Sequence, residues 1–219
     1  MGPKPRGRER SQKTVESIWQ CPDDAVAALV LGHGAGAGMR HANMQAIADA
    51  FAGRGIATLR FNFPFIEQGR KRVDPPKVAT ARIAEAFAEV GGRSTLPRWL
   101  GGHSFGGRMA SRAVLEHGLE PHGLVFCSFP LHAPGKPGIE RAKHLARIRR
   151  PILFLSGTRD SLAEAGLLEM LTGELDHAQL HFLDTADHGY RVLKRSRQSK
   201  EGVFDEMARV ARAFIDEPA

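Results

Sequence analysis

Short runs of consecutive apolar residues recur along the chain, and glycine, proline or polar residues follow each of them. A continuous apolar run is typical of a strand that is buried on both faces of a parallel sheet. An additional edge strand is expected within residues 13–20. We expect the buried strands at residues 25–31, 56–63, 99–102, 124–129, 151–155 and 179–183.

Between these runs, apolar residues recur every three or four positions, which is the spacing of one helix face. Gly53 and the pair Gly91-Gly92 should end the first two helices. Ser161 and Glu164 have the spacing of a capping box, so another helix should begin near Ser161. The expected helices cover residues 44–51, 79–90, 109–114, 141–148, a segment from about 161, and 203–214.

Strands that alternate with helices predict an α/β fold, in which a mostly parallel sheet carries helices on both faces. The segments between the strands leave little room for a lid. No internal repeat or linker is visible, and a length of 219 residues favours one domain. We expect this domain to cover residues 13–219, after a disordered basic arm at residues 1–12 that is rich in Pro, Gly and Arg.

The formal charge of +7 is concentrated at two places. Residues 1–13 carry a net charge of +4 and residues 191–200 carry +5, so the remainder of the chain is close to neutral. A basic patch can bind nucleic acid or another anionic surface. No interleaved aromatic residues and no nucleic-acid motif accompany these charges, so we favour a solvated tail and loop over a nucleic-acid site.

Other function classes lack support in the sequence. No apolar run approaches the roughly 18 residues of a membrane-spanning helix, and the polar N-terminus is not typical of a secretory signal. We therefore expect a cytoplasmic protein that does not bind membranes.

Cys21 and Cys127 make no disulfide framework, and no cluster has metal-ligand spacing, so neither a metal nor another cofactor is expected. The oligomeric state is left open.

The stretch Gly102-His103-Ser104-Phe105-Gly106 lies between an expected strand and an expected helix. In that context the pattern G-x-S-x-G is typical of a nucleophile elbow, a sharp turn that exposes a serine hydroxyl. Its glycines leave room for the close approach of strand and helix. The free N–H groups at the helix start favour negative charge nearby. Ser104 is therefore the candidate nucleophile.

Asp160 and His188 each follow an expected strand downstream of Ser104. A serine hydroxyl needs a base to take its proton, and imidazole titrates near neutral pH. We expect His188 to be that base and Asp160 to orient it, in the chain order Ser…Asp…His. Asp184 and Asp187 are the alternative acids. Asp184 follows the wrong strand for this order, and the side chain of Asp187 should diverge from its neighbour His188.

Two backbone N–H groups are expected to form an oxyanion hole, one from Phe105 and one from Ala35 in the glycine-rich turn, with Gly36 as the alternative. This turn lacks the lysine of a phosphate-binding P-loop. His33 and His103 lie beside the site and are expected to be structural hydrogen-bonding partners. Loop residues that could line an apolar substrate pocket, or simply cover the core, include Phe63, Phe65, Phe129 and Leu131.

Arg70, Lys71 and Arg72 form a second short run of cations in the expected loop at residues 64–76. Such a run could favour an acidic substrate, but a solvated loop is the more common structure.

The chain resembles compact α/β-hydrolases of the dienelactone-hydrolase-like kind over about residues 13–216. More narrowly, it is similar to a family of small predicted α/β-hydrolases that includes bacterial members and the testis-expressed type, and that is related to a subunit of the non-specific-lethal chromatin complex. This resemblance implies the α/β-hydrolase fold with a serine triad. The nucleophile of dienelactone hydrolase is cysteine, whereas position 104 is serine, so the lactone activity is not implied. The motifs that carry the resemblance are HGAGAGM (33–39), RFNFP (60–64), GGHSFGGRMAS (101–111), SGTRD (156–160) and DHGY (187–190).

These features together predict a serine hydrolase that cleaves small carboxylic esters or thioesters through an acyl-enzyme. The alternative is a non-catalytic interaction module built on the same fold. Binding of an acidic partner through the basic arm and residues 191–200 is a further alternative.

Overall fold

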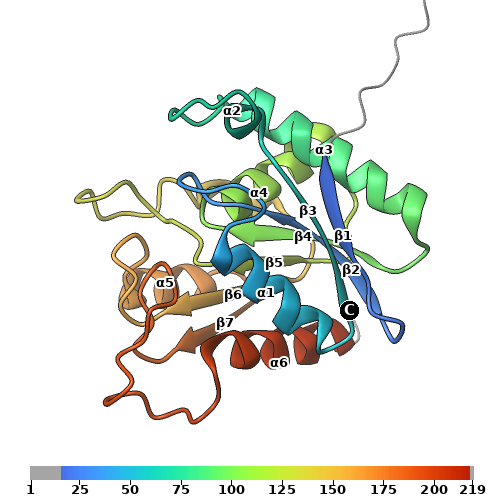
Figure 1. Ribbon diagram of the computed structural model, residues 1–219. Coiled ribbons are helices and arrows are strands. Elements are labelled where there is room, and N and C mark those ends of the chain that lie inside the picture. The colour runs from blue at the N-terminus through green and yellow to red at the C-terminus, as the bar shows by residue number, and fades with distance from the viewer. Residues whose placement is uncertain (1–15, 218–219) are drawn as a thin grey trace, which may run out of the picture.

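A computed structural model of the protein describes residues 16–217. The expected N-terminal arm at residues 1–12 lies outside the described residues. Within them, seven strands form one sheet in the order β1-β3-β2-β4-β5-β6-β7 (Figure 1). β1 pairs antiparallel with β3, and every other pair is parallel. The strands are β1 (Ser17–Gln20), β2 (Ala27–Gly32), β3 (Ile56–Phe61), β4 (Arg98–His103), β5 (Leu124–Cys127), β6 (Ile152–Gly157) and β7 (Ala178–Leu183).

Helices cover both faces of this sheet. α1 (Ala42–Ala52) and α6 (Val203–Asp216) pack together on one face, in front of the sheet in Figure 1. The other face carries α2 (Pro64–Glu67), α3 (Pro76–Arg93), α4 (Phe105–His117), the short 3-10 helix η1 (Lys143–Arg147) and α5 (Ala165–Gly173).

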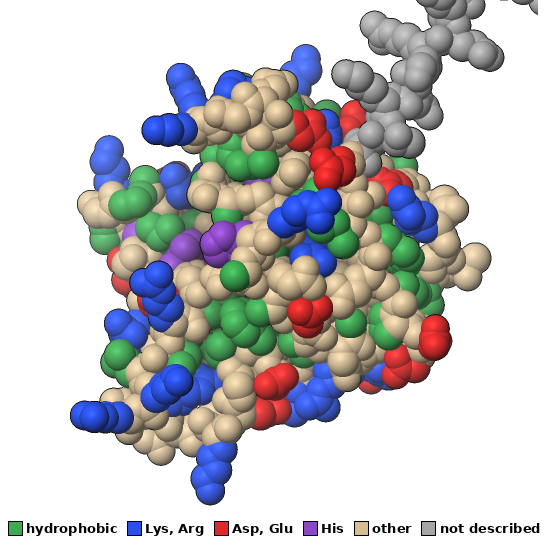
Figure 2. Space-filling view, in the orientation of Figure 1, with side chains coloured by type: hydrophobic (Ala, Val, Ile, Leu, Met, Phe, Trp, Pro, Cys, Tyr) green, Lys and Arg blue, Asp and Glu red, His purple; other side chains and the backbone are tan. Residues whose placement is uncertain are grey.

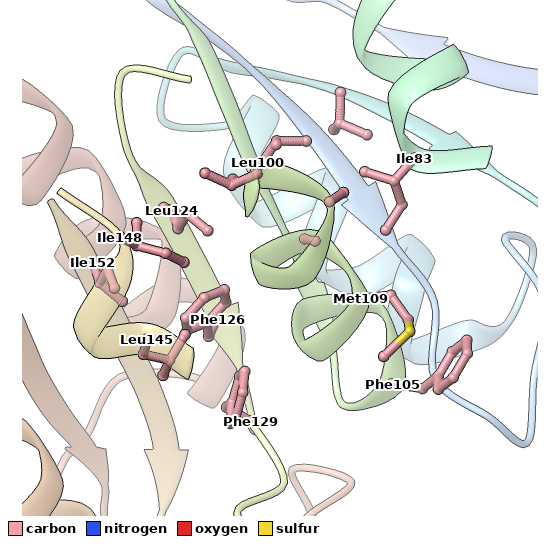
Figure 3. Packing of buried hydrophobic residues seen from close by; sticks show 14 of the residues in the cluster. Ile83, Leu100, Phe105, Met109, Leu124, Phe126, Phe129, Leu145, Ile148 and Ile152 are labelled. Atoms are coloured by element: carbon pink, nitrogen blue, oxygen red, sulfur yellow. The ribbon is translucent and has the colours of Figure 1, made fainter. Parts of the chain in front are cut away.

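The sheet separates two hydrophobic clusters, and this explains why the strand sequences are apolar without a break. Side chains alternate between the two faces of a strand. In β2, Ala28 and Val30 therefore join the cluster under α3 and α4, whereas Leu29 and Leu31 join the cluster under α1 and α6. Figure 3 shows part of the first cluster, in which Met109 of α4 faces the sheet. Both faces of the central strands are thus removed from water.

The mostly parallel sheet with helices on both faces is as expected, but several element boundaries differ. α3 continues through Gly91 and ends only at Arg93. A Cβ on Gly91 would lie 2.7 Å from Arg98 Nη1, so this glycine provides room for the arginine and does not stop the helix. α2 forms inside the expected loop, with Pro64 at its first position, where proline is well tolerated. The helix expected at residues 141–148 is only a five-residue 3-10 helix.

The capping box near Ser161 was a wrong prediction. α5 begins at Ala165, and Glu164 is its N-cap residue without a side-chain cap. The reason is local: Asp160 Oδ1 accepts the Leu162 N–H at 2.8 Å, and the Leu162 carbonyl accepts the Leu131 N–H at 2.9 Å. These two bonds hold residues 160–162 in a turn that ties the ends of β5 and β6 together.

Residues 191–200 contain no helix or strand, as expected, but they are not uniformly solvated. The Arg197 side chain is 5% exposed and forms an ion pair with Glu206 of α6, which is 8% exposed. In the described part of the chain, no helix combines the length and the apolar character that crossing a membrane requires.

Candidate active site

Ser104 lies in the tight turn between β4 and α4. Its backbone has φ 53° and ψ −113°, in a region that L-residues rarely occupy, and it is the N-cap residue of α4. A Cβ on Gly106 would lie 2.2 Å from the Gly32 carbonyl oxygen, and a Cβ on Gly102 would lie 2.3 Å from the same oxygen. The two glycines therefore permit β2 to pass directly beside the turn. The Ser104 N–H donates to the Cys127 carbonyl at 2.9 Å, which ties the turn to β5.

Three side chains from three different loops form a continuous hydrogen-bonded series. Ser104 Oγ lies 2.8 Å from His188 Nε2. His188 Nδ1 lies 2.9 and 2.8 Å from the two carboxylate oxygens of Asp160. An ionised carboxylate only accepts hydrogen bonds, so Nδ1 carries the proton and the lone pair of Nε2 faces the serine hydroxyl. The tautomer of His188 thus follows from the position of Asp160.

Asp160 is isolated from water, whereas His188 is partly open. The Asp160 side chain has no exposed area, and the His188 side chain is 24% exposed. Of the three candidate acids, only Asp160 contacts the imidazole in the described structure. Asp184 accepts the Gln198 N–H, and Asp187 accepts the N–H groups of Gly189 and Arg191.

The loop that carries His188 is held from three sides. Asp187 closes the turn through the bonds to Gly189 and Arg191 just described. His103 Nε2 donates to the His188 carbonyl at 2.9 Å, and Asn43 Nδ2 donates to the Gly189 carbonyl at 2.9 Å. His103 is therefore a structural partner, as expected. Burial is the main cause that lowers the pKa of His103 to about 4, so its ring is neutral at pH 7.

His33 anchors the glycine-rich turn after β2. Its Nδ1 donates to the Gly34 carbonyl at 2.7 Å, and its Nε2 accepts the Phe63 N–H at 3.1 Å. Because burial lowers the pKa of His33 to about 4, Nε2 stays free to accept that bond. A Cβ on Gly34 would lie 3.7 Å from Ser104 Cβ, so this turn lies directly beside the candidate nucleophile.

The two expected oxyanion-hole donors belong to segments next to Ser104. Phe105 is the first residue of α4, and Ala35 directly follows Gly34 in the turn beside Ser104. Among residues 16–217, neither N–H group has a hydrogen-bond acceptor. Both are therefore free to donate to a bound oxygen atom.

The four expected pocket residues belong to the core. Each is exposed by no more than 1%. Phe63 and Phe65 stack on each other and pack edge to face against Phe105. Phe129 packs against Phe126 and Phe154. Their burial favours the alternative in which they cover the core beneath the site. These residues are Phe63, Phe65, Phe129 and Leu131.

The structure instead contains an open pocket of about 370 Å³ at the exposed side of His188. The sequence motifs contain several of its residues but did not predict that they line one pocket, because they come from the start of α1 and from the loops after β6 and β7. Figure 2 shows His side chains grouped at the edge where the strands end, with Lys and Arg side chains projecting around them. The pocket is lined by His41, Asn43, Arg159, Ser161, Asp187, His188, Gly189 and Arg191.

In the described part of the chain, no group of three or more His, Cys, Asp or Glu side chains could hold a metal ion. The two cysteines are both free, Cys21 at the surface and Cys127 in the core.

Several solved structures share this architecture, although their sequences are distant from this one. An α/β serine hydrolase homologue from Coxiella burnetii is 17% identical, with a TM-score of 0.69 over 92% of this chain and 89% of that chain. A dienelactone hydrolase from Anabaena variabilis is 18% identical, with a TM-score of 0.69 over 91% and 89%. An α/β serine hydrolase without a lid from Xanthomonas campestris is 21% identical, with a TM-score of 0.65 over 89% and 88%. These likenesses show the fold.

A family model agrees with the fold and covers most of the chain. The model described as the alpha/beta hydrolase domain matches residues 25–216, from the residues before β2 to the end of α6. That span includes all strands of the parallel part of the sheet and all three side chains of the hydrogen-bonded series. The chain is a member of the alpha/beta hydrolase domain family.

Proposed function

We propose that this hydrolase is a serine esterase or thioesterase that acts on small substrates through an acyl-enzyme. The observation that carries the proposal is the series Ser104 Oγ, His188 Nε2 and Asp160, joined by hydrogen bonds of 2.8 to 2.9 Å. In such a series the imidazole accepts the serine proton, and the buried carboxylate stabilises the imidazolium that forms. The serine hydroxyl then becomes a competent nucleophile.

In the first half of the reaction, Ser104 Oγ bonds to the substrate carbonyl carbon while its proton moves to His188 Nε2. The N–H groups of Ala35 and Phe105 stabilise the resulting oxyanion. The intermediate then expels the alcohol or thiol, which takes the proton from His188. In the second half, water adds to the acyl-enzyme by the same route and releases the carboxylic acid and free Ser104.

Fluorophosphonate labelling tests the proposal, because the probe reacts only with an activated serine. We expect the native chain to be labelled on Ser104 and to hydrolyse p-nitrophenyl esters of short acids. Ser104→Ala should remove the label and reduce hydrolysis by about 10³-fold or more, since the triad acts as a unit. Circular dichroism of Ser104→Ala should match the native chain.

A native chain that stays unlabelled would favour a non-catalytic scaffold, and an active, folded Ser104→Ala variant would refute the serine mechanism. The narrower kinship with the testis-expressed type, the single domain over residues 13–219 and the cytoplasmic location all stay predictions.

A further inference from the structure

Two cations, Arg159 and Arg191, line the pocket beside His188. Arg159 and Arg191 are exposed, and neither has a carboxylate within ion-pair distance among residues 16–217. The short basic run at residues 70–72 differs, since Arg70 is already paired with Asp74. Unpaired guanidinium groups that face one hollow are available to bind an anion, because guanidinium matches carboxylate and phosphate in geometry.

Within residues 16–217, most side-chain donors of these two arginines have no acceptor. Arg159 Nη1 donates to the Thr185 carbonyl at 3.2 Å, and this is the one hydrogen bond of the Arg159 side chain in the described structure. The Arg191 side chain has none, although its backbone N–H is fixed by Asp187 at 2.9 Å. The base of Arg191 is therefore held in place while its guanidinium group can turn toward a ligand.

One carboxylate, that of Asp187, also lines the pocket and contributes to its charge. Asp187 Oδ1 accepts the N–H groups of both Gly189 and Arg191, each at 2.9 Å, so its charge is partly compensated by the backbone. The lining thus holds two guanidinium groups against one carboxylate, and it adds hydrogen-bonding side chains from His41, Asn43 and Ser161. The excess charge is positive.

The position of the pocket indicates which part of a substrate it would hold. Its wall includes His188 but neither Ser104 nor the glycine-rich turn at residues 33–38. The acyl carbonyl must lie between Ser104 and that turn. The leaving atom must lie beside His188, because the imidazole donates the proton to it. Since His188 lines the pocket, a group attached to the leaving atom can extend into it.

We propose that the pocket selects esters or thioesters whose leaving alcohol or thiol carries an anionic group, a carboxylate or a phosphate. This inference rests on the proposed function. Arg159 and Arg191 bind this anion and determine specificity for the leaving group. The acyl group is bound outside this pocket.

The test compares acetyl esters that share one acyl group and differ in leaving-group charge. 4-Acetoxybenzoate is anionic and 4-acetoxybenzamide is its neutral counterpart of similar shape, while 4-acetoxyphenyl phosphate distinguishes phosphate from carboxylate. We expect the native kcat/KM to be at least about fivefold higher for one of the anions than for the amide, because a partly exposed ion pair strengthens binding by about that factor. This ratio should fall toward one as salt rises, because exposed charges are screened.

Variants assign the effect to the two arginines. In Arg191→Gln and Arg159→Gln the anion-to-amide ratio should fall toward one. Arg195→Gln removes another exposed cation of the same segment that does not line the pocket, and its ratio should match the native value. A native ratio near one, or a ratio that survives Arg191→Gln, would overturn the inference. Fluorophosphonate labelling of the same samples separates the outcomes, since a labelled chain with a ratio of one retains the serine mechanism and loses only this inference.

Discussion

At the scale of single residues, three histidines near Ser104 have different roles because their surroundings differ. His188 is partly exposed and bonded to Asp160, which suits it to exchange a proton. His33 and His103 are surrounded by protein, and burial holds the pKa of each at about 4. Both act as neutral hydrogen-bonding groups that position backbone segments on either side of the serine.

The neutral state of His33 predicts an acid dependence of stability. Its pKa in the folded chain is about 4, below the ordinary 6.5, so between these values the unfolded chain binds a proton that the folded chain does not. The contribution of His33 to the free energy of unfolding is therefore fully present above pH 6.5 and is lost as pH falls toward 4. In His33→Gln, which can still accept the Phe63 N–H, the decrease in this free energy between pH 7 and pH 5 should be smaller by roughly 2 kcal/mol. Urea denaturation of both chains at pH 7 and pH 5 measures these free energies of unfolding.

His122 offers the matched control, since it is exposed. His122→Gln should leave the acid dependence at its native steepness. An acid dependence in His33→Gln as steep as in the native chain would contradict the role given to His33.

At the scale of elements, the site depends on how closely β2, β4 and α4 approach one another. The turn at Ser104 has room only because Gly102 and Gly106 lack side chains where they meet Gly32. The contacts are to backbone atoms, which cannot move aside as a flexible side chain could. Sequence spacing identified this turn because strand, turn and helix are contiguous in the chain.

This close approach predicts opposite effects for two glycine-to-alanine changes in helices. Gly106→Ala places a Cβ 2.2 Å from the Gly32 carbonyl oxygen and should lower the free energy of unfolding by about 3 kcal/mol. Gly92→Ala in α3 meets no atom within 4 Å and should raise it by about 0.5 kcal/mol through helix propensity. Chemical denaturation of both variants checks the pair. Equal effects of the two changes would show that packing at the turn is not limiting.

At the scale of the whole molecule, a buried ionic cluster ties residues 191–200 to the body. Arg197 donates to the Asp184 carbonyl and pairs with Glu206 of α6, and His181 Nε2 of β7 lies 2.8 Å from the same glutamate. The cluster joins the last strand to the last helix. It also closes the loop on which Arg191 is carried.

Loss of Arg197 should therefore destabilise the fold far more than loss of its exposed neighbour. Arg197→Met leaves the buried Glu206 carboxylate without its cation and should cost about 3 kcal/mol or more. Arg195→Met, at an exposed position, should change stability by no more than about 0.5 kcal/mol. Thermal unfolding of the two variants gives the comparison. Similar unfolding temperatures for both would contradict a buried role for Arg197, and Arg197→Met with Glu206→Leu should recover part of the loss.

Most of the fold could be predicted from local patterns. Apolar runs and helix-face spacing identified the strands and the main helices because both depend on residues a few positions apart. Ser104, Asp160 and His188 could be proposed together because each follows its own strand, and parallel strands end at one edge of the sheet. The capping-box prediction at Ser161 was wrong because a contact with Leu131, thirty residues away, outweighed the local pattern.

The sequence by itself thus determined the class of fold, the order of its elements and the candidate chemistry at Ser104. Only the tertiary structure decided which side chains surround that chemistry. It placed Phe63 and Phe65 in the core, paired Arg197 inside the protein and left Arg159 and Arg191 facing a pocket beside His188. The physical reason is that burial and charge pairing depend on neighbours from distant parts of the chain, and no local pattern records them.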